Sequence, residues 1–213
     1  MIAEAGSHPV VVDLHPDRPE YRGIRGPPVV SWEADPSFEA IEAVGGKVET
    51  SGEVHEVLGG FFAVSGGIPR VTGYEGGLRR GVRFVSGGGG GEGEGRWESD
   101  EEIADERFVM SGADVAADKG IVMFTGCSHA GVVNASRHAV ELGQGAPLYA
   151  VMGGYHLADG ESELITKSVA DLKALDPKLL IAGHCTGWRA KFRIQEEMPG
   201  RLVPSFVGNK LVL

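Results

Sequence analysis

The chain has 213 residues, of which 42% are hydrophobic and 23% are charged, and its formal net charge is −10. This composition is ordinary for a globular domain with one substantial core, and the acidic balance argues against a general nucleic-acid-binding surface. Its two cysteines, Cys127 and Cys185, are too few for a disulfide framework and favour a reducing compartment. With no apolar run of the roughly 20 residues that a membrane span needs and no secretory pattern at the start, we expect a cytoplasmic protein without membrane or nucleic-acid partners.

The first predicted elements are short and separated by turns. Residues 9–14, PVVVDL, predict a buried strand. Residues 35–46 predict a helix with Asp35 as N-cap, Pro36 at the first helical position and Gly45 at its end. A strand at 60–66, GFFAVSG, is followed by a turn-rich loop, GGIPRVTGYEGG.

Residues 86–106 are of low complexity. Seven glycines fall between Gly87 and Gly95, and acidic residues follow them. Such a segment has too little apolar surface to offset the entropy lost on ordering. We therefore predict a flexible Gly/acid-rich insertion within a single domain over residues 1–213.

Strands and helices alternate clearly from residue 107 onward. Apolar runs predict strands, while periods near 3.6 and closing glycines predict helices. The helix at 162–175 has Leu164, Ile165, Val169, Leu172 and Leu175 on one side. The predicted strands cover 107–110, 121–125, 148–152, 178–182, 202–208 and 210–213, and the other helices cover 131–143 and 188–198.

Three of these strands are each followed by a glycine and, within a few residues, by a histidine. His129, His156 and His184 are spaced 27 and 28 residues apart, about one strand–helix unit each. Strands joined through a helix are usually parallel, so their C-terminal ends share one edge of a sheet, where ligands bind in α/β folds. Because imidazole is a common ligand for zinc and other transition ions, the pattern favours a metal site. Three unrelated loop histidines remain the alternative.

The cysteines allow other interpretations. Cys127 is two residues before His129, and Cys185 directly follows His184, so a structural Cys/His zinc site is conceivable. The spacing differs from that of compact zinc modules, and adjacent residues at a strand end tend to point in opposite directions. We therefore expect both cysteines to be packed neighbours of the histidines, and a disulfide between them is the weakest alternative.

The motifs TGCSHAGVVN, AVMGGYHL and IAGHCTG, in this order, resemble the C-terminal half of metallo-β-lactamase-fold proteins. The closest likeness is to the branch of 7,8-dihydropterin-6-methyl-4-(β-D-ribofuranosyl)-aminobenzene-5'-phosphate synthase-like hydrolases. The resemblance implies an α/β fold, an αββα sandwich, with one or two divalent ions, most often zinc, at the sheet edge. It also implies a metal-dependent hydrolase or transferase that uses activated water on a small, phosphorylated or pterin-like substrate.

By motif, His129 and His184 match metal ligands, and His156 matches an additional site histidine of the branch. Cys127, Cys185 and Thr186 are then neighbours behind the ligands. The resemblance departs at one point, because the H-x-H-x-D-H motif of the family is absent. In the family that motif supplies most ligands of the first metal, so we expect an N-terminally truncated domain with impaired activity. A non-catalytic remnant and a structural Cys/His zinc domain are the alternatives.

Overall fold

A computed structural model describes residues 9–86, 95–112, 119–208 and 210–212. By internal contacts the chain divides into two compact units, one of residues 1–52 and 78–105 and the other of residues 53–77 and 106–213. The single domain expected over 1–213 therefore stays a prediction. No helix in the described ranges combines the length and the apolar character needed to span a bilayer.

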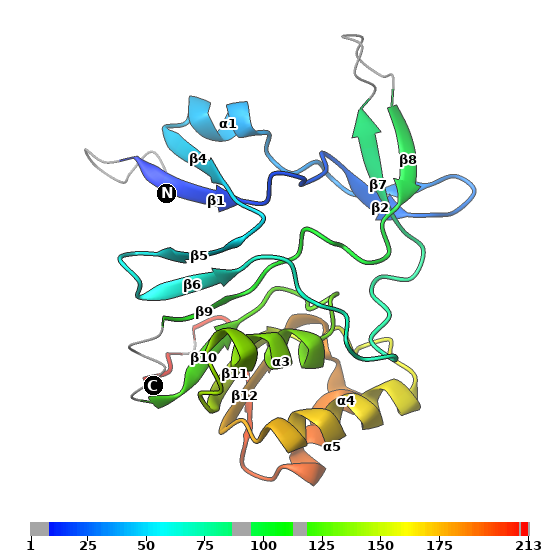
Figure 1. Ribbon diagram of the computed structural model, residues 1–213. Helices are drawn as coiled ribbons and strands as arrows, with labels where there is room; N and C mark the ends of the chain where they lie inside the picture. The colour runs from blue at the N-terminus through cyan, green and yellow to red at the C-terminus, as the bar shows by residue number, and fades with distance from the viewer. Residues whose placement is uncertain (1–8, 87–94, 113–118, 209, 213) are drawn as a thin grey trace. The chain divides into compact units, whose positions relative to one another are not determined.

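The second unit is built on a seven-stranded sheet (Figure 1). The order is β13-β12-β11-β10-β9-β6-β5, with parallel pairing from β13 to β10 and antiparallel pairing from β10 to β5. The strands are β5 (Val54–Val57), β6 (Phe62–Ser65), β9 (Val109–Ser111), β10 (Ile121–Phe124), β11 (Leu148–Gly154), β12 (Leu179–Gly183) and β13 (Leu202–Pro204).

The parallel strands of this sheet end together. In register, Phe124 of β10 pairs with Met152 of β11, and Met152 pairs with Ile181 of β12. These strands are near-continuous apolar runs, which is typical of parallel strands. The loops that follow β10, β11 and β12 therefore leave the sheet at one edge.

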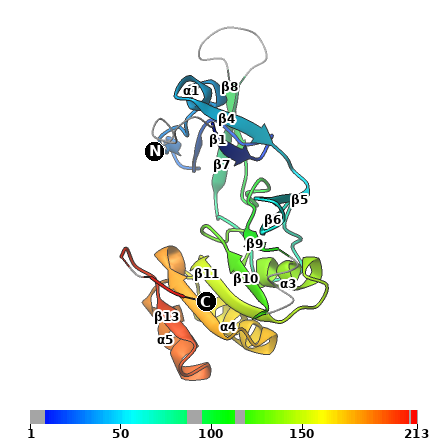
Figure 2. The same ribbon diagram turned by 90° about the vertical axis from the view of Figure 1, so that its left-hand side faces the viewer.

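Three helices of the second unit pack on the sheet and on one another (Figures 1 and 2). They are α3 (Val132–Leu142), α4 (Ser162–Leu175) and α5 (Trp188–Glu197). The predicted apolar side of α4 is confirmed, since Ile165, Val169 and Leu172 are buried in the main core. That core also contains Phe108, Met110, Ile121, Met123, Val132, Val133, Leu148, Val151, Leu180 and Ile194.

The first unit contains two smaller sheets. In one, β1 (Val10–Leu14) pairs in parallel with β4 (Gly46–Thr50), and the helix α1 (Phe38–Ala43) precedes β4. The other has the order β3-β2-β7-β8, formed by β3 (Val30–Ser31), β2 (Arg22–Ile24), β7 (Gly81–Ser86) and β8 (Gly95–Ser99).

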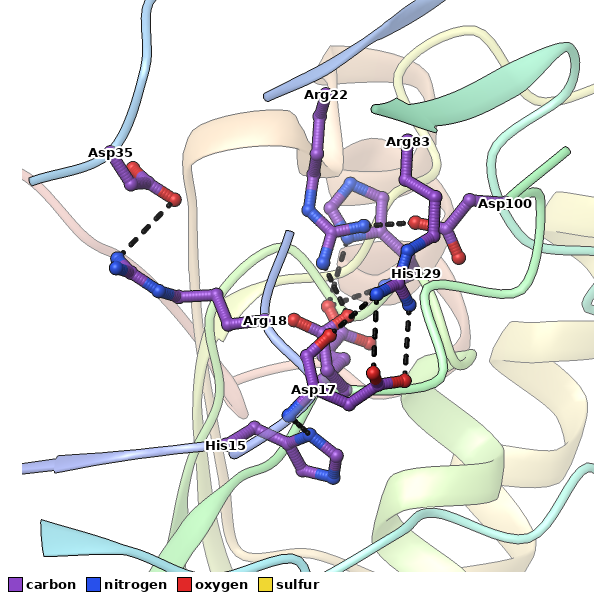
Figure 3. Close-up of polar contacts among 10 residues, drawn as sticks. His15, Asp17, Arg18, Arg22, Asp35, Arg83, Asp100 and His129 are labelled. Carbon is purple, nitrogen blue, oxygen red and sulfur yellow. Dashed lines mark hydrogen bonds and ion pairs between the residues drawn. The ribbon is translucent and has the colours of Figure 1, made fainter. Parts of the chain in front are cut away.

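Ion pairs connect the segments of the first unit (Figure 3). The guanidinium of Arg22 donates to the carboxylates of Asp100 and Asp105, whose side chains are 7% and 10% exposed. Arg83 donates to Asp17 at 3.2 Å. The largely buried guanidinium of Arg22 is thus matched by two carboxylates, which a cation with restricted access to water requires.

Several predicted boundaries shift. Ser37, not Asp35, is the N-cap of α1, because its hydroxyl accepts a hydrogen bond from the Ala40 N–H at 3.1 Å. Part of the predicted insertion is a strand, β8, paired with β7, whereas residues 87–94 lie outside the described residues. The C-terminal strand ends at Pro204, and residues 210–212 form no strand.

Candidate metal site

The loops after β10, β11 and β12 carry the three predicted histidines. Ser128, His156 and His184 in these loops all have positive φ, between 46° and 58°. For residues other than glycine this conformation is uncommon and clusters at functional sites. The backbone is therefore turned sharply at the points where the side chains leave the sheet edge.

His129 is held by a carboxylate that the sequence did not indicate. The Glu106 Oε1 atom accepts hydrogen bonds from the Nδ1 and the backbone N–H of His129, both at 2.9 Å, and Oε2 accepts from the Ala130 N–H. Burial raises the pKa of Glu106, but the hydrogen bonds from His129 and Ala130 outweigh it, and the pKa lies below its ordinary value. The ionised carboxylate directs the Nδ1–H of His129 toward itself and leaves Nε2 for a ligand.

His156 lies beside His129. The two ring centroids are 4.7 Å apart at an interplanar angle of 60°. Burial lowers the pKa of His156, and the neighbouring His129 lowers it further. A neutral imidazole is the form that binds a metal, so this environment favours the ligating state of His156.

A small cavity lies next to this pair. It measures about 30 Å³ and is lined by residues that include Glu75, Ser128, His129, Tyr155 and His156. This volume exceeds the roughly 10–15 Å³ that one water requires. The cavity therefore has room for a water-sized occupant at the two imidazoles.

Glu75 also fixes the start of α3. Its carboxylate accepts hydrogen bonds from the N–H groups of Val133 and Asn134, both at 2.9 Å, and from the Thr72 hydroxyl. The helix has Gly131 as its N-cap and no capping side chain of its own, so Glu75 supplies the acceptors from a distant loop. Burial raises the pKa of Glu75 despite these bonds.

His184 lies in a different group of donors. It begins a short 3-10 turn, η2 (His184–Thr186), and its Nδ1 atom is 3.3 Å from the Cys127 Sγ. Among the residues that the structure describes, donor atoms gather within 4.8 Å of one another at Cys127, His184 and Cys185. The sequence pattern predicted that adjacent side chains here would point in opposite directions, as at a strand end. His184 and Cys185 instead lie in a turn, and their side chains point to the same group.

Both cysteines are free thiols and half-buried. Burial raises the pKa of Cys127 to about 12, and the nearby Cys185 adds to the shift. Without a cation the Cys127 thiol is therefore protonated at neutral pH. A bound cation inverts this preference, because it stabilises the thiolate.

Thr186, the last predicted neighbour, is fully buried. Its hydroxyl donates to the Gly183 carbonyl at 2.7 Å and accepts from the Tyr155 N–H at 3.2 Å. It thereby ties the loop after β12 to the loop after β11. The structure thus brings His129 together with His156 and places His184 with the cysteines, while a common three-histidine site stays a prediction.

Glu106 and Glu75 are the site residues that the sequence motifs missed. Glu106 ends the acid-rich run 98–106, and no feature of the sequence distinguishes it from the other acidic residues of this run. Glu75 lies in the loop GGIPRVTGYEGG, whose turn residues carry no signal for a helix 57 residues later. Both act through contacts between segments that lie far apart in the sequence.

Comparisons with known proteins agree with the predicted resemblance. Over 86 residues the chain is 36% identical to the 7,8-dihydropterin-6-methyl-4-(beta-D-ribofuranosyl)-aminobenzene-5'-phosphate synthase of Methanocaldococcus jannaschii, a match that covers 40% of this chain and 29% of that protein. The uncharacterized protein MJ0448 of the same organism is 28% identical over 96 residues, 45% of this chain and 33% of that protein. The matched segments thus span about a third of these relatives. No protein-family model matches the chain.

A solved structure shows the fold. Tm1679, described as a metal-dependent hydrolase of the beta-lactamase superfamily, superimposes with a TM-score of 0.73 over 95% of this chain and 71% of its own, at 21% identity. The chain therefore has the mixed α/β, metallo-β-lactamase-like fold that the histidine motifs predicted.

Proposed function

We propose that this chain is a metal-dependent hydrolase or transferase that acts on a small substrate. The observation that carries the proposal is the pair of imidazoles of His129 and His156, with ring centroids 4.7 Å apart at the edge where the parallel strands end. Ligands of α/β folds bind at this edge of the sheet, and two neighbouring imidazoles there suit a metal ion that activates water. The fold neighbour, itself described as a metal-dependent hydrolase, supports the same class.

The residues at the imidazole pair fit a divalent cation. His129 donates its Nδ1–H to the Glu106 carboxylate, which is the arrangement that metal-ligating histidines usually show. His156 is kept neutral by its surroundings. His129 and His156 would hold the ion, which we propose to be zinc, whereas His184, the third ligand predicted from the sequence, lies with the two cysteines.

When bound, such an ion supplies a water acidified to a pKa near 7. The residues of the chain would contribute to this chemistry by holding the metal-binding side chains in position. Glu106 fixes the ring of His129, and Glu75 fixes the first turn of α3 directly after it. The substrate class is taken from the M. jannaschii relative, whose name describes a phosphorylated pterin compound. We propose a substrate of this kind and a cytoplasmic location.

Turnover by the 213-residue chain should be low. The H-x-H-x-D-H motif is absent from it, and in the resembling family this motif holds much of the metal and the attacking water. A non-catalytic, metal-binding remnant is the competing function, and the same absence favours it. Activity of the purified chain separates the two proposals.

The test is hydrolysis of p-nitrophenyl phosphate, bis-p-nitrophenyl phosphate and a simple lactone by the full chain with zinc or manganese. We expect weak, metal-dependent turnover of at least one substrate, and a loss of at least about 100-fold in His129→Ala. His55→Ala is the matched control, because His55 lies on β5, away from the strand ends that carry the pair. Turnover that is absent in the wild type, or equal in His129→Ala, would overturn the hydrolase in favour of the remnant.

A further inference from the structure

We infer that Cys127, His184 and Cys185 form a second, thiolate-rich zinc site with one open coordination position. The Sγ atoms of the two cysteines and a ring nitrogen of His184 lie within 4.8 Å of one another. The inference does not rest on the hydrolase proposal, because none of its steps uses His129, His156 or a substrate.

The geometry already approaches that of a zinc site. Zinc bonds of about 2.3 Å to sulfur and about 2.0 Å to nitrogen place tetrahedral ligands roughly 3.5–3.8 Å from one another. The Cys127 Sγ and the His184 Nδ1 are 3.3 Å apart without a cation. The other donor pairs lie within 4.8 Å, so side-chain rotations are enough to bring the three donors to bonding distance.

The backbone around the group is fixed in place. The N–H groups of Leu157 and Ala158 both donate to the Cys185 carbonyl at 3.0 Å, which ties the turn after β12 to the loop after β11. The Cys185 thiol donates to the Cys127 carbonyl at 3.4 Å. The backbone of Cys185 is thus held by the loop after β11, and its thiol already lies against the loop that carries Cys127. The thiol hydrogen bond is given up when Cys185 binds the cation as a thiolate.

Because Gly154 has no side chain, the Cys185 thiol and the His184 imidazole can lie close to the backbone of β11. A Cβ atom at this position would lie 2.7 Å from the Cys185 Sγ and 3.2 Å from the His184 Nδ1. Both contacts are closer than van der Waals contact allows. Only glycine at residue 154 lets the thiol and the imidazole approach from the side of β11.

The donor types select the ion. Two thiolates and one imidazole suit zinc, whereas magnesium and calcium prefer oxygen. Binding displaces the thiol protons to solvent, so each cysteine that ligates releases one proton. Three protein donors leave a fourth tetrahedral position for water or an exogenous ligand.

The fourth position has an open approach. Cys127 and His184 line a pocket of about 400 Å³ at the ends of β10, β11 and β12. A purely structural zinc site has four protein ligands and is closed. The pocket and the count of three donors therefore point to a site that can exchange a small ligand on the metal.

Cobalt substitution of the full chain tests the thiolate ligation. Cobalt(II) bound by cysteine gives an intense near-ultraviolet sulfur-to-metal charge-transfer band that imidazole ligation does not give. We expect about one equivalent of cobalt with this band, and its displacement by zinc. A titration that yields no charge-transfer band would overturn the inference.

Variants assign the band to the three residues. Cys127→Ser and Cys185→Ser should each reduce the band and lower zinc affinity by more than the roughly 10–100-fold that loss of an outer-sphere partner causes. His129→Ala should keep the band, and His138→Gln, on the helix α3, is the control histidine. A band that survives in the double serine variant contradicts the assignment. Loss of hydrolysis in His129→Ala with an intact band would show the two sites to be separate.

Thiol protection gives a result that does not depend on variant folding. The wild-type chain is treated with iodoacetamide with and without saturating zinc, and alkylation is followed by mass spectrometry. We expect zinc to slow alkylation of both Cys127 and Cys185 at least 10-fold. Equal alkylation rates with and without zinc would overturn the site.

Discussion

The carboxylate of Glu106 accepts the Nδ1–H and the backbone N–H of His129, each at 2.9 Å, across 23 residues of sequence. One side chain therefore sets both the ring orientation and the backbone position of the best candidate ligand. This pairing makes Glu106 a positioning residue for any metal that His129 binds.

Glu106→Gln should lower the affinity of the His129–His156 pair for a divalent cation by about 10–100-fold. The amide cannot match the strength of the charged acceptor, and His129 loses its fixed tautomer. Competition with a chromophoric chelator measures the affinity, and circular dichroism checks that the variant is folded. Glu141→Gln, an exposed change on α3, is the control. A folded Glu106→Gln chain with unchanged affinity would show that Glu106 has only a structural role.

Stability should depend on pH through Glu75. Its folded pKa is raised above the ordinary value of 4.5, chiefly by burial. A carboxyl whose pKa is raised in the folded state holds its proton more tightly there than in the unfolded state. The stabilisation of the fold by this proton is therefore complete below pH 4.5 and is lost as the pH rises through the folded pKa. Urea unfolding in chelator should therefore show the wild type losing stability above pH 4.5 relative to Glu75→Gln. Parallel pH profiles of the two proteins would rule out the linkage.

Gly154→Ala should disrupt the thiol–imidazole group. The added Cβ would also lie 3.1 Å from the Gly126 carbonyl, so relief requires the loops to move. We expect a loss of about 1–3 kcal/mol in stability, as for overpacked cores, together with loss of the cobalt–thiolate band. Gly126→Ala is the matched control in the neighbouring loop, because a Cβ there meets no atom within 4 Å. Equal effects of the two substitutions would contradict this prediction.

Two polar residues on α3 should respond in opposite ways to alanine. Asn134 accepts from the N–H groups of Val71 and Thr72 and donates to the Ala130 carbonyl. Asn134→Ala leaves these groups unpaired and should cost about 2–4 kcal/mol. The buried Ser136 Oγ has no hydrogen-bond partner among the described residues, so Ser136→Ala should be neutral or slightly stabilising. Thermal unfolding of both variants measures the contrast, and a destabilised Ser136→Ala would indicate an undetected partner.

Local sequence patterns predicted much of the second unit. The apolar runs at 121–125 and 148–152 are the buried strands β10 and β11, and the 3.6-residue period at 162–175 is α4 with the predicted ends. These patterns work because strand and helix periodicity depend on neighbouring residues. The N-cap of α1 was missed, because Asp35, Ser37 and their neighbours offer competing caps within three positions.

The sequence by itself determined the fold and the delivery of His129, His156 and His184 to the ends of three strands. Only the tertiary structure decided which groups meet there. The packing of separate loops joins Glu106 to His129 across 23 residues and Cys127 to His184 across 57 residues. Such contacts leave no periodic trace in the chain, because they depend on the position of a turn in space and not on the residues beside it.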